Sequence, residues 1–253
     1  MTQSEVRKAL AAAGIENADG EARILTEEFQ NEAALSAALK RRTRHEPLQY
    51  IIGRWEFFRE RYFVSPDCLI PRPDTEILVE YLVKRLPRGA RFLDLCTGSG
   101  CIAVSTAKNR PDTVGAAADV SEKALALAKK NAEANGVSLT FYTLDVKSPS
   151  PLDTVYDCIC ANPPYIRTAV VDTLSPEVAH EPRIALDGGA DGLDFYRAIL
   201  SNFAKNLAAG GCFVFEFGYD QKADAERLAE KYGYSVFTID DYGGNFRAAV
   251  LTK

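Results

Sequence analysis

The sequence has little histidine and no Cys-x-x-Cys motif. Only His45 and His180 occur among 253 residues, so a histidine-based metal centre or a Ser-His-Asp triad has almost nothing to draw on. No Cys-x-x-Cys pair is present, which argues against a zinc site or a disulfide framework. Most cysteines lie in apolar runs typical of core strands, so we interpret them as reduced, buried thiols. They are Cys68, Cys96, Cys101, Cys158, Cys160 and Cys212.

The chain also lacks a long apolar run and a strong positive charge. No run approaches the roughly 20 apolar residues of a membrane-spanning helix. The first residues, MTQSEVRKAL, lack the features of a secretory signal, so we expect a cytoplasmic protein without a membrane partner. The net charge of −5 argues against general nucleic-acid binding. Residues 40–61 carry seven Lys or Arg against three Glu, which predicts either a solvated surface or a docking patch.

The first 66 residues are expected to form two small units. Residues 1–45 repeat apolar side chains at helical spacing and contain no strand-like run, so we predict an N-terminal helical domain. A segment of this length buries little core alone and should pack against the rest of the chain. Residues 46–66 are rich in Tyr, Ile, Trp and Phe. They predict a β-hairpin linker, broken near Gly53 or near Arg59 and Glu60.

Residues 67–253 alternate strand-like and helical runs. This alternation predicts a doubly wound α/β sheet of seven strands, mostly parallel. The last two strands have a short connection, which predicts an antiparallel edge. A helix over 121–135 is expected to begin after Ser121 as its N-cap and to end at Gly136 as its C-cap. The candidate strands are 90–95, 114–119, 139–144, 155–161, 211–217, 234–240 and 246–252.

A glycine-rich turn, from Asp94 to Gly100, follows the first of these strands and leads into a helix. Glycine lets a ligand approach the backbone, and the carboxyl edge of such a sheet is where ligands bind. Asp119 ends the second strand, where an acid can accept hydrogen bonds from both ribose hydroxyls. These features indicate a cofactor containing adenosine, and they suit NAD as well as S-adenosylmethionine. Asp145, after the third strand, either contacts the adenine or caps the next element.

The fourth strand ends in Asn162-Pro163-Pro164-Tyr165 at the same sheet edge. Two prolines remove two backbone donors, so this turn mainly offers acceptors. The Asn162 side-chain oxygen and the Pro163 carbonyl can hold both N–H bonds of one substrate NH₂ group, while Tyr165 offers an aromatic face. Such positioning is worth about 7–11 kcal/mol in favourable cases and aims the nitrogen lone pair at a sulfonium methyl group. The turn therefore indicates methyl transfer from S-adenosylmethionine to an amide or aromatic amine.

Further motifs are spread over nearly the whole chain. They are Pro47-Leu-Gln-Tyr50, Gly53-x-Trp55-x-Phe57, Ile70-Pro-Arg-Pro-Asp-Thr-Glu76, Asp94 to Gly100, Asn162 to Tyr165, Glu181-Pro-Arg183, Leu186-Asp-Gly-Gly189 and Asp191-Gly-Leu-Asp-Phe-Tyr196. With these motifs the chain resembles the bacterial release factor glutamine methyltransferases. Asn-Pro-Pro-Tyr alone is shared with adenine and cytosine amino-methyltransferases. The combination of the segments ending at Glu76 and at Tyr196 is more specific.

The resemblance implies a Rossmann-like methyltransferase fold and an enzyme that uses S-adenosylmethionine. The methyl group would pass to N5 of the glutamine in the Gly-Gly-Gln tripeptide of class I peptide-chain release factors, leaving S-adenosylhomocysteine. The helical domain would help to grip the release factor. Asn162 and Pro163 would hold the glutamine amide, beside Pro164 and Tyr165. The implied cofactor residues are Asp94, Cys96, Thr97, Gly98, Ser99, Gly100, Asp119, Val120, Asp145, Val146 and Asn162. No metal is expected.

Two positions depart from the pattern of this family. Cys96 stands where many relatives have glycine, which leaves its backbone less freedom, and His180 stands where a tyrosine is expected. Three further residues keep two interpretations each. Arg72 and Glu76 either shape the cofactor pocket or serve the structure, and Glu216 either faces the cleft or caps the sheet edge.

Other functions remain open at this point. The same catalytic turn serves adenine-N6 methyltransferases that act on a flipped base. Such enzymes need a target-recognition domain or a broad basic surface, and the sequence offers neither, so we expect no sequence-specific nucleic-acid binding. Methylation of another protein glutamine is a closer alternative. A non-catalytic adaptor of the same fold is a third, although Asn162 and the glycine turn are intact.

Overall fold

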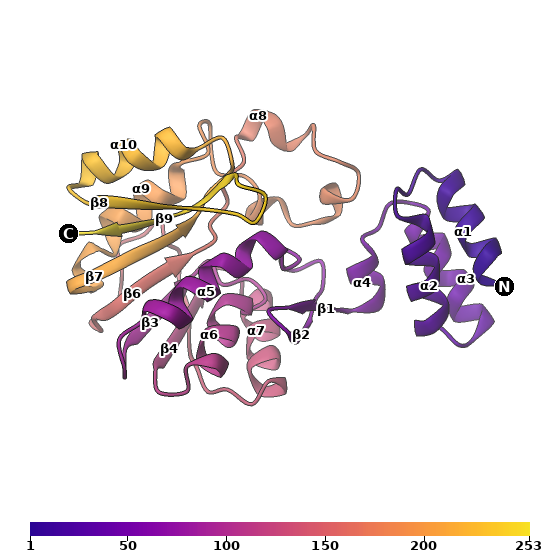
Figure 1. Cartoon of the computed structure of the whole chain (residues 1–253), viewed down its shortest axis with the longest axis horizontal. Coiled ribbons are helices and arrows are strands. Elements are labelled where there is room, and N and C mark those ends of the chain that lie inside the picture. Colours follow the sequence, from indigo (N-terminus) through magenta and orange to yellow (C-terminus); the bar gives the residue numbers. More distant parts are fainter.

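A computed structural model describes residues 1–253, and its N-terminal end is a cluster of helices (Figure 1). Asn17 and Asn31 accept hydrogen bonds from the first backbone N–H groups of α2 and α3, and Thr2 forms a capping box with Glu5 in α1. The apolar faces of all four helices meet in one shared core. The helices are α1 (Gln3–Ala12), α2 (Ala18–Glu28), α3 (Glu32–Arg42) and α4 (Leu48–Ile52).

The connection to the rest of the chain is a short helix followed by a hairpin. Strands β1 (Arg54–Phe57) and β2 (Glu60–Phe63) pair antiparallel around a turn at residues 58–59. The predicted hairpin over 46–66 is therefore too long, because its first part forms α4. Gly53 ends that helix in the left-handed conformation, with a φ of 77°. A short apolar run does not distinguish a strand from a buried helix, which explains the error.

The remaining residues form a seven-stranded sheet in the order β5-β4-β3-β6-β7-β9-β8. Neighbouring strands from β5 to β7 run parallel, and β9 pairs antiparallel with both β7 and β8. The predicted doubly wound sheet and its antiparallel edge are confirmed. The strands are β3 (Arg91–Leu95), β4 (Val114–Asp119), β5 (Thr140–Thr143), β6 (Tyr156–Ala161), β7 (Leu207–Glu216), β8 (Ser235–Asp240) and β9 (Phe246–Thr252).

Helices cover both faces of the sheet, as Figure 1 shows. One core lies under α5 and α6, and the other lies under α9 and α10. Short 3-10 helices occupy Pro73–Thr75, Val178–His180, Arg183–Ala185 and Ala204–Asn206. None of the helices combines the length and the apolar character needed to cross a bilayer. The α-helices are α5 (Glu76–Arg85), α6 (Cys101–Asn109), α7 (Glu122–Ala134), α8 (Thr168–Val171), α9 (Asp194–Asn202) and α10 (Lys222–Tyr232).

Local sequence signals explain the boundaries of α7. The Ser121 side chain accepts a hydrogen bond from the Ala124 backbone N–H (3.2 Å), as its predicted N-cap role requires. The C-cap is Asn135, one residue before the predicted Gly136. Gly136 follows it with a φ of 69°, a conformation that glycine adopts without steric cost. This helix and α6 both start at the carboxyl edge of the sheet, where β3, β4 and β6 end.

Candidate active site

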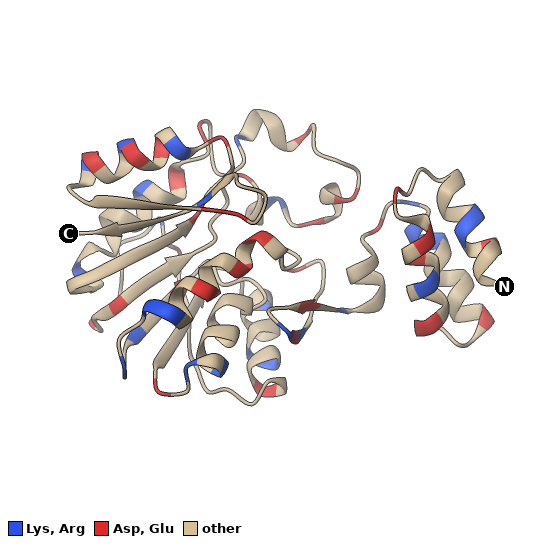
Figure 2. Ribbon diagram, in the orientation of Figure 1, with Lys and Arg blue, Asp and Glu red and all other residues tan.

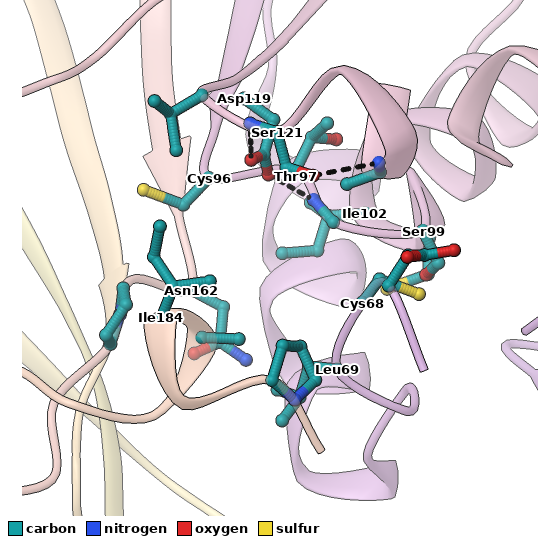
Figure 3. A pocket seen from close by; sticks show the side chains of 18 of the residues that line it. Cys68, Leu69, Cys96, Thr97, Ser99, Ile102, Asp119, Ser121, Asn162 and Ile184 are labelled. Atoms are coloured by element: carbon teal, nitrogen blue, oxygen red, sulfur yellow. Dashed lines mark hydrogen bonds between the residues drawn. The ribbon is translucent and has the colours of Figure 1, made fainter. Parts of the chain in front are cut away.

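A cavity opens at the carboxyl edge of the parallel strands (Figure 3). The turns after β3, β4, β5 and β6 form much of its lining. Further lining residues include residues 67–72, Thr75, Pro182, Ile184, Ala185 and Phe195. In Figure 3, Asp119 lies beside Thr97 and Ser121, while Asn162 lies toward Leu69 and Ile184. Of the residues predicted to bind ligand, the following line the cavity: Cys96, Thr97, Gly98, Ser99, Asp119, Val120, Asp145, Val146, Asn162 and Pro164.

Three residues of the glycine turn adopt left-handed backbone conformations. The φ angles are 56° at Cys96, 54° at Gly98 and 80° at Gly100. Glycine reaches this region without steric cost, whereas a side chain there costs about 1–2 kcal/mol. Gly100 does not line the cavity but begins α6, where an added Cβ would lie 3.0 Å from the Cβ of Ala128 in α7. Its role in the structure is close packing of two helices.

Asp94 is fully buried behind the turn and does not line the cavity. Its carboxylate accepts a hydrogen bond from the Thr97 hydroxyl (2.5 Å). Burial raises the pKa of Asp94 to about 7. The structure therefore places this predicted cofactor residue where it shapes the turn from behind, because its position in β3 directs the side chain into the protein.

Asp119 lines the cavity and is held in place by the backbone. One carboxylate oxygen accepts from the Gly98 N–H (2.9 Å) and the other accepts from the Ser121 N–H (2.9 Å). Each oxygen keeps a second lone pair, so the group can still accept two further hydrogen bonds. Burial raises the pKa of Asp119, and these backbone bonds oppose the shift. The arrangement suits a ligand that presents two hydroxyl groups.

The lining beyond Asp119 offers apolar surfaces to a flat group. Val120 and Val146 lie on it, as does Phe195, whose aromatic ring the sequence analysis did not assign to the site. The ammonium group of Lys147 lies 4.2 Å from the centre of the Phe195 ring. Asp145 also lines the cavity, and it accepts a hydrogen bond from the Lys147 N–H (2.9 Å), so it caps its own turn as well.

The Asn162 side chain, in the turn after β6, also lines the cavity. Its Nδ2 donates a hydrogen bond to the Thr75 hydroxyl oxygen (3.1 Å). Thr75 in turn donates to Oε2 of Glu216 (2.6 Å), which is 1% exposed. Burial raises the pKa of Glu216 to about 7. The sequence analysis missed Thr75 and left Glu216 open, although Thr75 lies in the motif ending at Glu76 and could have been singled out there.

Two members of the Asn-Pro-Pro-Tyr turn lie away from the lining. Pro163 is buried, and Tyr165 packs its ring against the core of the sheet. The Tyr165 hydroxyl donates to Oε1 of Glu216 (3.3 Å). This placement gives no support to the predicted stacking of a substrate on Tyr165, because the core and Glu216 occupy its ring and hydroxyl. Pro164 lines the cavity.

Residues 177–185, which follow the Asn-Pro-Pro-Tyr turn and are called the covering segment, line part of the cavity. Hydrogen bonds connect this segment to residues 70–72. The buried Glu181 accepts a hydrogen bond from the Ile70 N–H (3.0 Å) and pairs with the guanidinium of Arg72. Next to it, Ile184 lines the cavity while remaining 59% exposed. Arg72 therefore shapes the pocket wall. Glu76 instead accepts from the Phe58 N–H (2.8 Å), which anchors the hairpin.

The covering segment also contacts the N-terminal helices. Arg42, which is 2% exposed, pairs with Glu21 in α2 and with Glu177 in this segment. His180 lies close by, with its Nε2 3.4 Å from the carbonyl oxygen of Arg44. His180, which departs from the family pattern, therefore lies at a contact between the N-terminal helices and the covering segment. It is not part of the Asn-Pro-Pro-Tyr turn.

Three of the seven basic residues between 40 and 61 form close ion pairs with glutamates. Arg41 pairs with Glu46, Arg54 pairs with Glu28, and Arg42 has its two glutamate partners. The ribbon in Figure 2 shows acidic and basic positions mixed along the N-terminal helices and along α10. These pairs favour the interpretation of the segment as an internally balanced surface over a basic docking patch.

Comparisons with known proteins agree with this geometry. A family model for a methyltransferase small domain matches residues 73–185. A release factor glutamine methyltransferase from Geobacter sulfurreducens is 42% identical, over 84% of this chain and 75% of the relative. One from Agrobacterium fabrum is 37% identical, over 98% of this chain and 94% of the relative. A methyltransferase structure from Pyrococcus furiosus has a TM-score of 0.57 at 21% identity, covering 76% of this chain and 87% of that one, which shows the shared fold.

Proposed function

Because the chain belongs to the release factor glutamine methyltransferase family, we propose that it methylates N5 of the glutamine in the Gly-Gly-Gln motif of class I peptide-chain release factors. The methyl donor is S-adenosylmethionine, and the second product is S-adenosylhomocysteine. One observation carries the proposal. The amide of Asn162 lines the same cavity as the Asp119 carboxylate and the glycine turn, so an amide anchor and a nucleoside site share one space.

The residues that line the cavity fit the proposed cofactor. Asp119 has two free lone pairs for the ribose hydroxyls, and Val120, Val146 and Phe195 offer apolar surface to the adenine. The turn that begins at Cys96 is left for the methionine end. When bound, the cofactor supplies a methyl group on a sulfonium centre, which is electrophilic enough for a weak nucleophile.

The side chains of this protein make the weak nucleophile reactive. An amide nitrogen shares its lone pair with the carbonyl, and two acceptors on its N–H bonds favour the pyramidal form that frees the pair. The two acceptors we assign are the side-chain oxygen of Asn162, which lines the cavity, and the backbone carbonyl of Pro163, which the family resemblance implies and which belongs to a buried residue. Their dipoles also stabilise positive charge that develops on the nitrogen. No lining side chain needs to act as a strong base, since the methylated nitrogen loses its proton readily.

We also propose that the N-terminal helices, residues 1–45, and the linker, residues 46–66, serve the methyltransferase domain, residues 67–253, by gripping the release factor. The relative from Agrobacterium fabrum aligns over 98% of this chain, so it has a counterpart of these helices. The Arg42 pairs join them to the segment that covers the cavity. The reaction would take place in the cytoplasm, where release factors meet ribosomes.

Mass spectrometry of a release factor tests the proposal. A purified class I release factor is incubated with the protein and S-adenosylmethionine, and we expect one added methyl group on the Gly-Gly-Gln glutamine. A release factor with this glutamine replaced by alanine should gain none. The variant Asn162→Ala should bind the cofactor but methylate slowly. Absence of methylation, with cofactor binding detected by calorimetry, would contradict the release factor as substrate and direct the search to other amides and to adenine.

A further inference from the structure

Three polar side chains from distant parts of the sequence form a row that runs from the cavity lining into the protein interior. Glu216 ends β7, Thr75 ends the 3-10 helix before α5, and Asn162 follows β6. The Thr75 hydroxyl oxygen lies 2.6 Å from Oε2 of Glu216 and 3.1 Å from Nδ2 of Asn162. The Asn162 end lines the cavity, while the Glu216 end is buried.

The number of available protons decides which group donates each hydrogen bond in this row. An ionised carboxylate only accepts hydrogen bonds, so the single hydroxyl proton of Thr75 must point to Glu216. The Thr75 oxygen can then only accept from Asn162, which requires the NH₂ group of the amide on that side. An amide carries one NH₂ and one oxygen on opposite branches. The Asn162 oxygen is therefore left on the branch that Thr75 does not hold.

Without Thr75, nothing in the shape of the amide would select this orientation. The NH₂ and the oxygen of asparagine have nearly the same size, so only hydrogen bonds distinguish the two orientations. A reversed amide would present its donors to the NH₂ group of a substrate, which also donates. Such an arrangement loses the substrate hydrogen bond and leaves buried donors unsatisfied.

Glu216 is surrounded in a way that suits this role. The Tyr165 hydroxyl donates to its other carboxylate oxygen (3.3 Å), and the Tyr196 hydroxyl donates to its backbone carbonyl (2.6 Å). The charges that face it are Arg247 of β9, which favours the carboxylate, and Asp74, which opposes it. Arg247 is itself paired with Asp74 (3.0 Å). A carboxylate buried mainly among hydroxyl groups is costly for the fold, and packing alone does not require it.

We propose that Glu216 and Thr75 are positioning residues for methyl transfer, which hold the Asn162 amide with its oxygen available to the substrate NH₂ group. The inference rests on the proposed function for its catalytic meaning, but the orientation of the amide can be measured without any substrate. We assign neither residue a contact with the reacting atoms, although Thr75 reaches the cavity lining. Each acts through Asn162.

The first experiment compares matched substitutions of two buried threonines. Thr75→Val keeps the shape but removes the hydroxyl, and we expect kcat to fall about 10- to 100-fold, less than the loss of a direct transition-state donor. The KM for the release factor and the Kd for S-adenosylmethionine should stay within about threefold. Thr75→Ser should restore kcat. Thr106→Val is the control, because the Thr106 hydroxyl is buried without a partner, and its kcat should be unchanged.

Two outcomes of this comparison would overturn the proposal. A Thr75→Val enzyme with the kcat of the wild type would show that the hydroxyl does not position Asn162. A fall in cofactor affinity that accounts for the whole loss would make Thr75 a cofactor contact instead. Melting temperatures of all variants identify any general loss of structure, and the Thr106→Val enzyme gives the baseline for a buried threonine.

A second experiment measures the amide itself. The side-chain ¹⁵N–¹H₂ signals of Asn162 are assigned by their absence in Asn162→Asp, and one of the two protons should be protected from exchange by the bond to Thr75. Thr75→Val should lose this protection and Thr75→Ser should keep it. Protection that survives in Thr75→Val overturns the positioning role. If the amide behaves as expected but the wild type methylates no release factor, the proposed function fails and the positioning stands.

Discussion

Asp119 serves two purposes at the scale of single residues. Its carboxylate closes the glycine turn through the Gly98 N–H and begins the next turn through the Ser121 N–H, and it faces the cavity at the same time. Cys96 illustrates the opposite situation, in which a residue with a side chain occupies a left-handed conformation with a φ of 56°. The strain at Cys96, about 1–2 kcal/mol, accompanies a backbone that passes close to the ligand site.

Replacing the Asp119 charge should weaken cofactor binding. Asp119→Asn keeps the size of the side chain but removes the charge that strengthens hydrogen bonds from the ribose, each worth about 1.5–3 kcal/mol. We expect the Kd for S-adenosylmethionine to rise at least about tenfold in titration calorimetry. Asp145→Asn is the matched control at another lining carboxylate, and its effect should be smaller. An unchanged affinity in Asp119→Asn would move the ribose site elsewhere.

The titration of Glu216 gives a pH dependence with a defined sign. Burial raises its pKa to about 7, well above the ordinary value for glutamate. Below this pKa, a protonated Glu216 can donate a hydrogen bond to Thr75. The Thr75 hydroxyl can then donate to the Asn162 side-chain oxygen, which favours the reversed orientation of the amide. We therefore expect kcat of the wild type to fall as pH drops from about 8 to about 6. In Glu216→Gln, this part of the pH–rate profile should be flat, and a profile identical to that of the wild type would contradict the assignment.

The same shift affects stability in the opposite direction. An acid whose pKa is higher in the folded state binds its proton more tightly there, so the stability that it contributes is lost as pH rises from its ordinary pKa through about 7. The melting temperature of Glu216→Gln, measured relative to that of the wild type, should therefore rise as pH increases from 5.5 to 8. This comparison cancels the titration of groups that both proteins share.

At the scale of secondary-structure elements, α6 and α7 are positioned by a close contact that leaves no room for an added side chain. Helices α6 and α7 flank the glycine turn, and they approach each other at Gly100 and Ala128. An added Cβ at Gly100 would lie 3.0 Å from the Ala128 Cβ and 3.2 Å from its Cα. Because the second of these atoms is backbone, the helix itself would have to move.

Gly100→Ala should therefore destabilise the protein beyond the cost of its backbone conformation. The left-handed φ of 80° contributes about 1–2 kcal/mol, and overpacking against α7 adds about 1–3 kcal/mol. Gly136→Ala is the matched control, because Gly136 has a φ of 69° and no atom within 4 Å of the added Cβ. Urea unfolding should give a clearly larger loss for Gly100→Ala. Equal losses of unfolding free energy in the two variants would show that α7 can move away from the added Cβ without an energetic cost.

Across the whole molecule, one buried arginine joins three segments. Arg42 at the end of α3 pairs with Glu21 of α2 and with Glu177 of the segment that covers the cavity. Its third partner is the Glu46 carbonyl (3.3 Å). The pairs connect the proposed docking helices to a wall of the active site. A release factor bound to these helices would therefore contact a part that is coupled to the cavity.

Removing this arginine should be costly in two measurements. Arg42→Met leaves Glu21, which is 14% exposed, without its partner, and we expect a loss of about 2–4 kcal/mol in urea unfolding. The KM for the release factor should also rise. Arg41→Met is the control, because the Arg41 pair with Glu46 is more exposed and should contribute less than about 1 kcal/mol. Similar losses in both variants would contradict a special role for Arg42.

The sequence by itself determined the strands, the doubly wound sheet and the place of the two candidate ligand turns at one edge of the sheet. These features depend on local periodicity, on glycine and proline, and on the rule that parallel strands present their turns at one edge. Helix α4 escaped prediction because a mostly apolar run of five residues fits a strand as well as a helix.

Only the tertiary structure decided which side chains meet at the cavity. Thr75, Asn162 and Glu216 are separated by 87 residues and by 141 residues along the chain, counted from Thr75. Asp94 and Tyr165 turned inward, away from the lining, although other residues of the same two turns face it. The physical reason is that hydrogen-bond partners far apart in sequence, and the burial that shifts their pKa values, exist only after the strands and helices have packed.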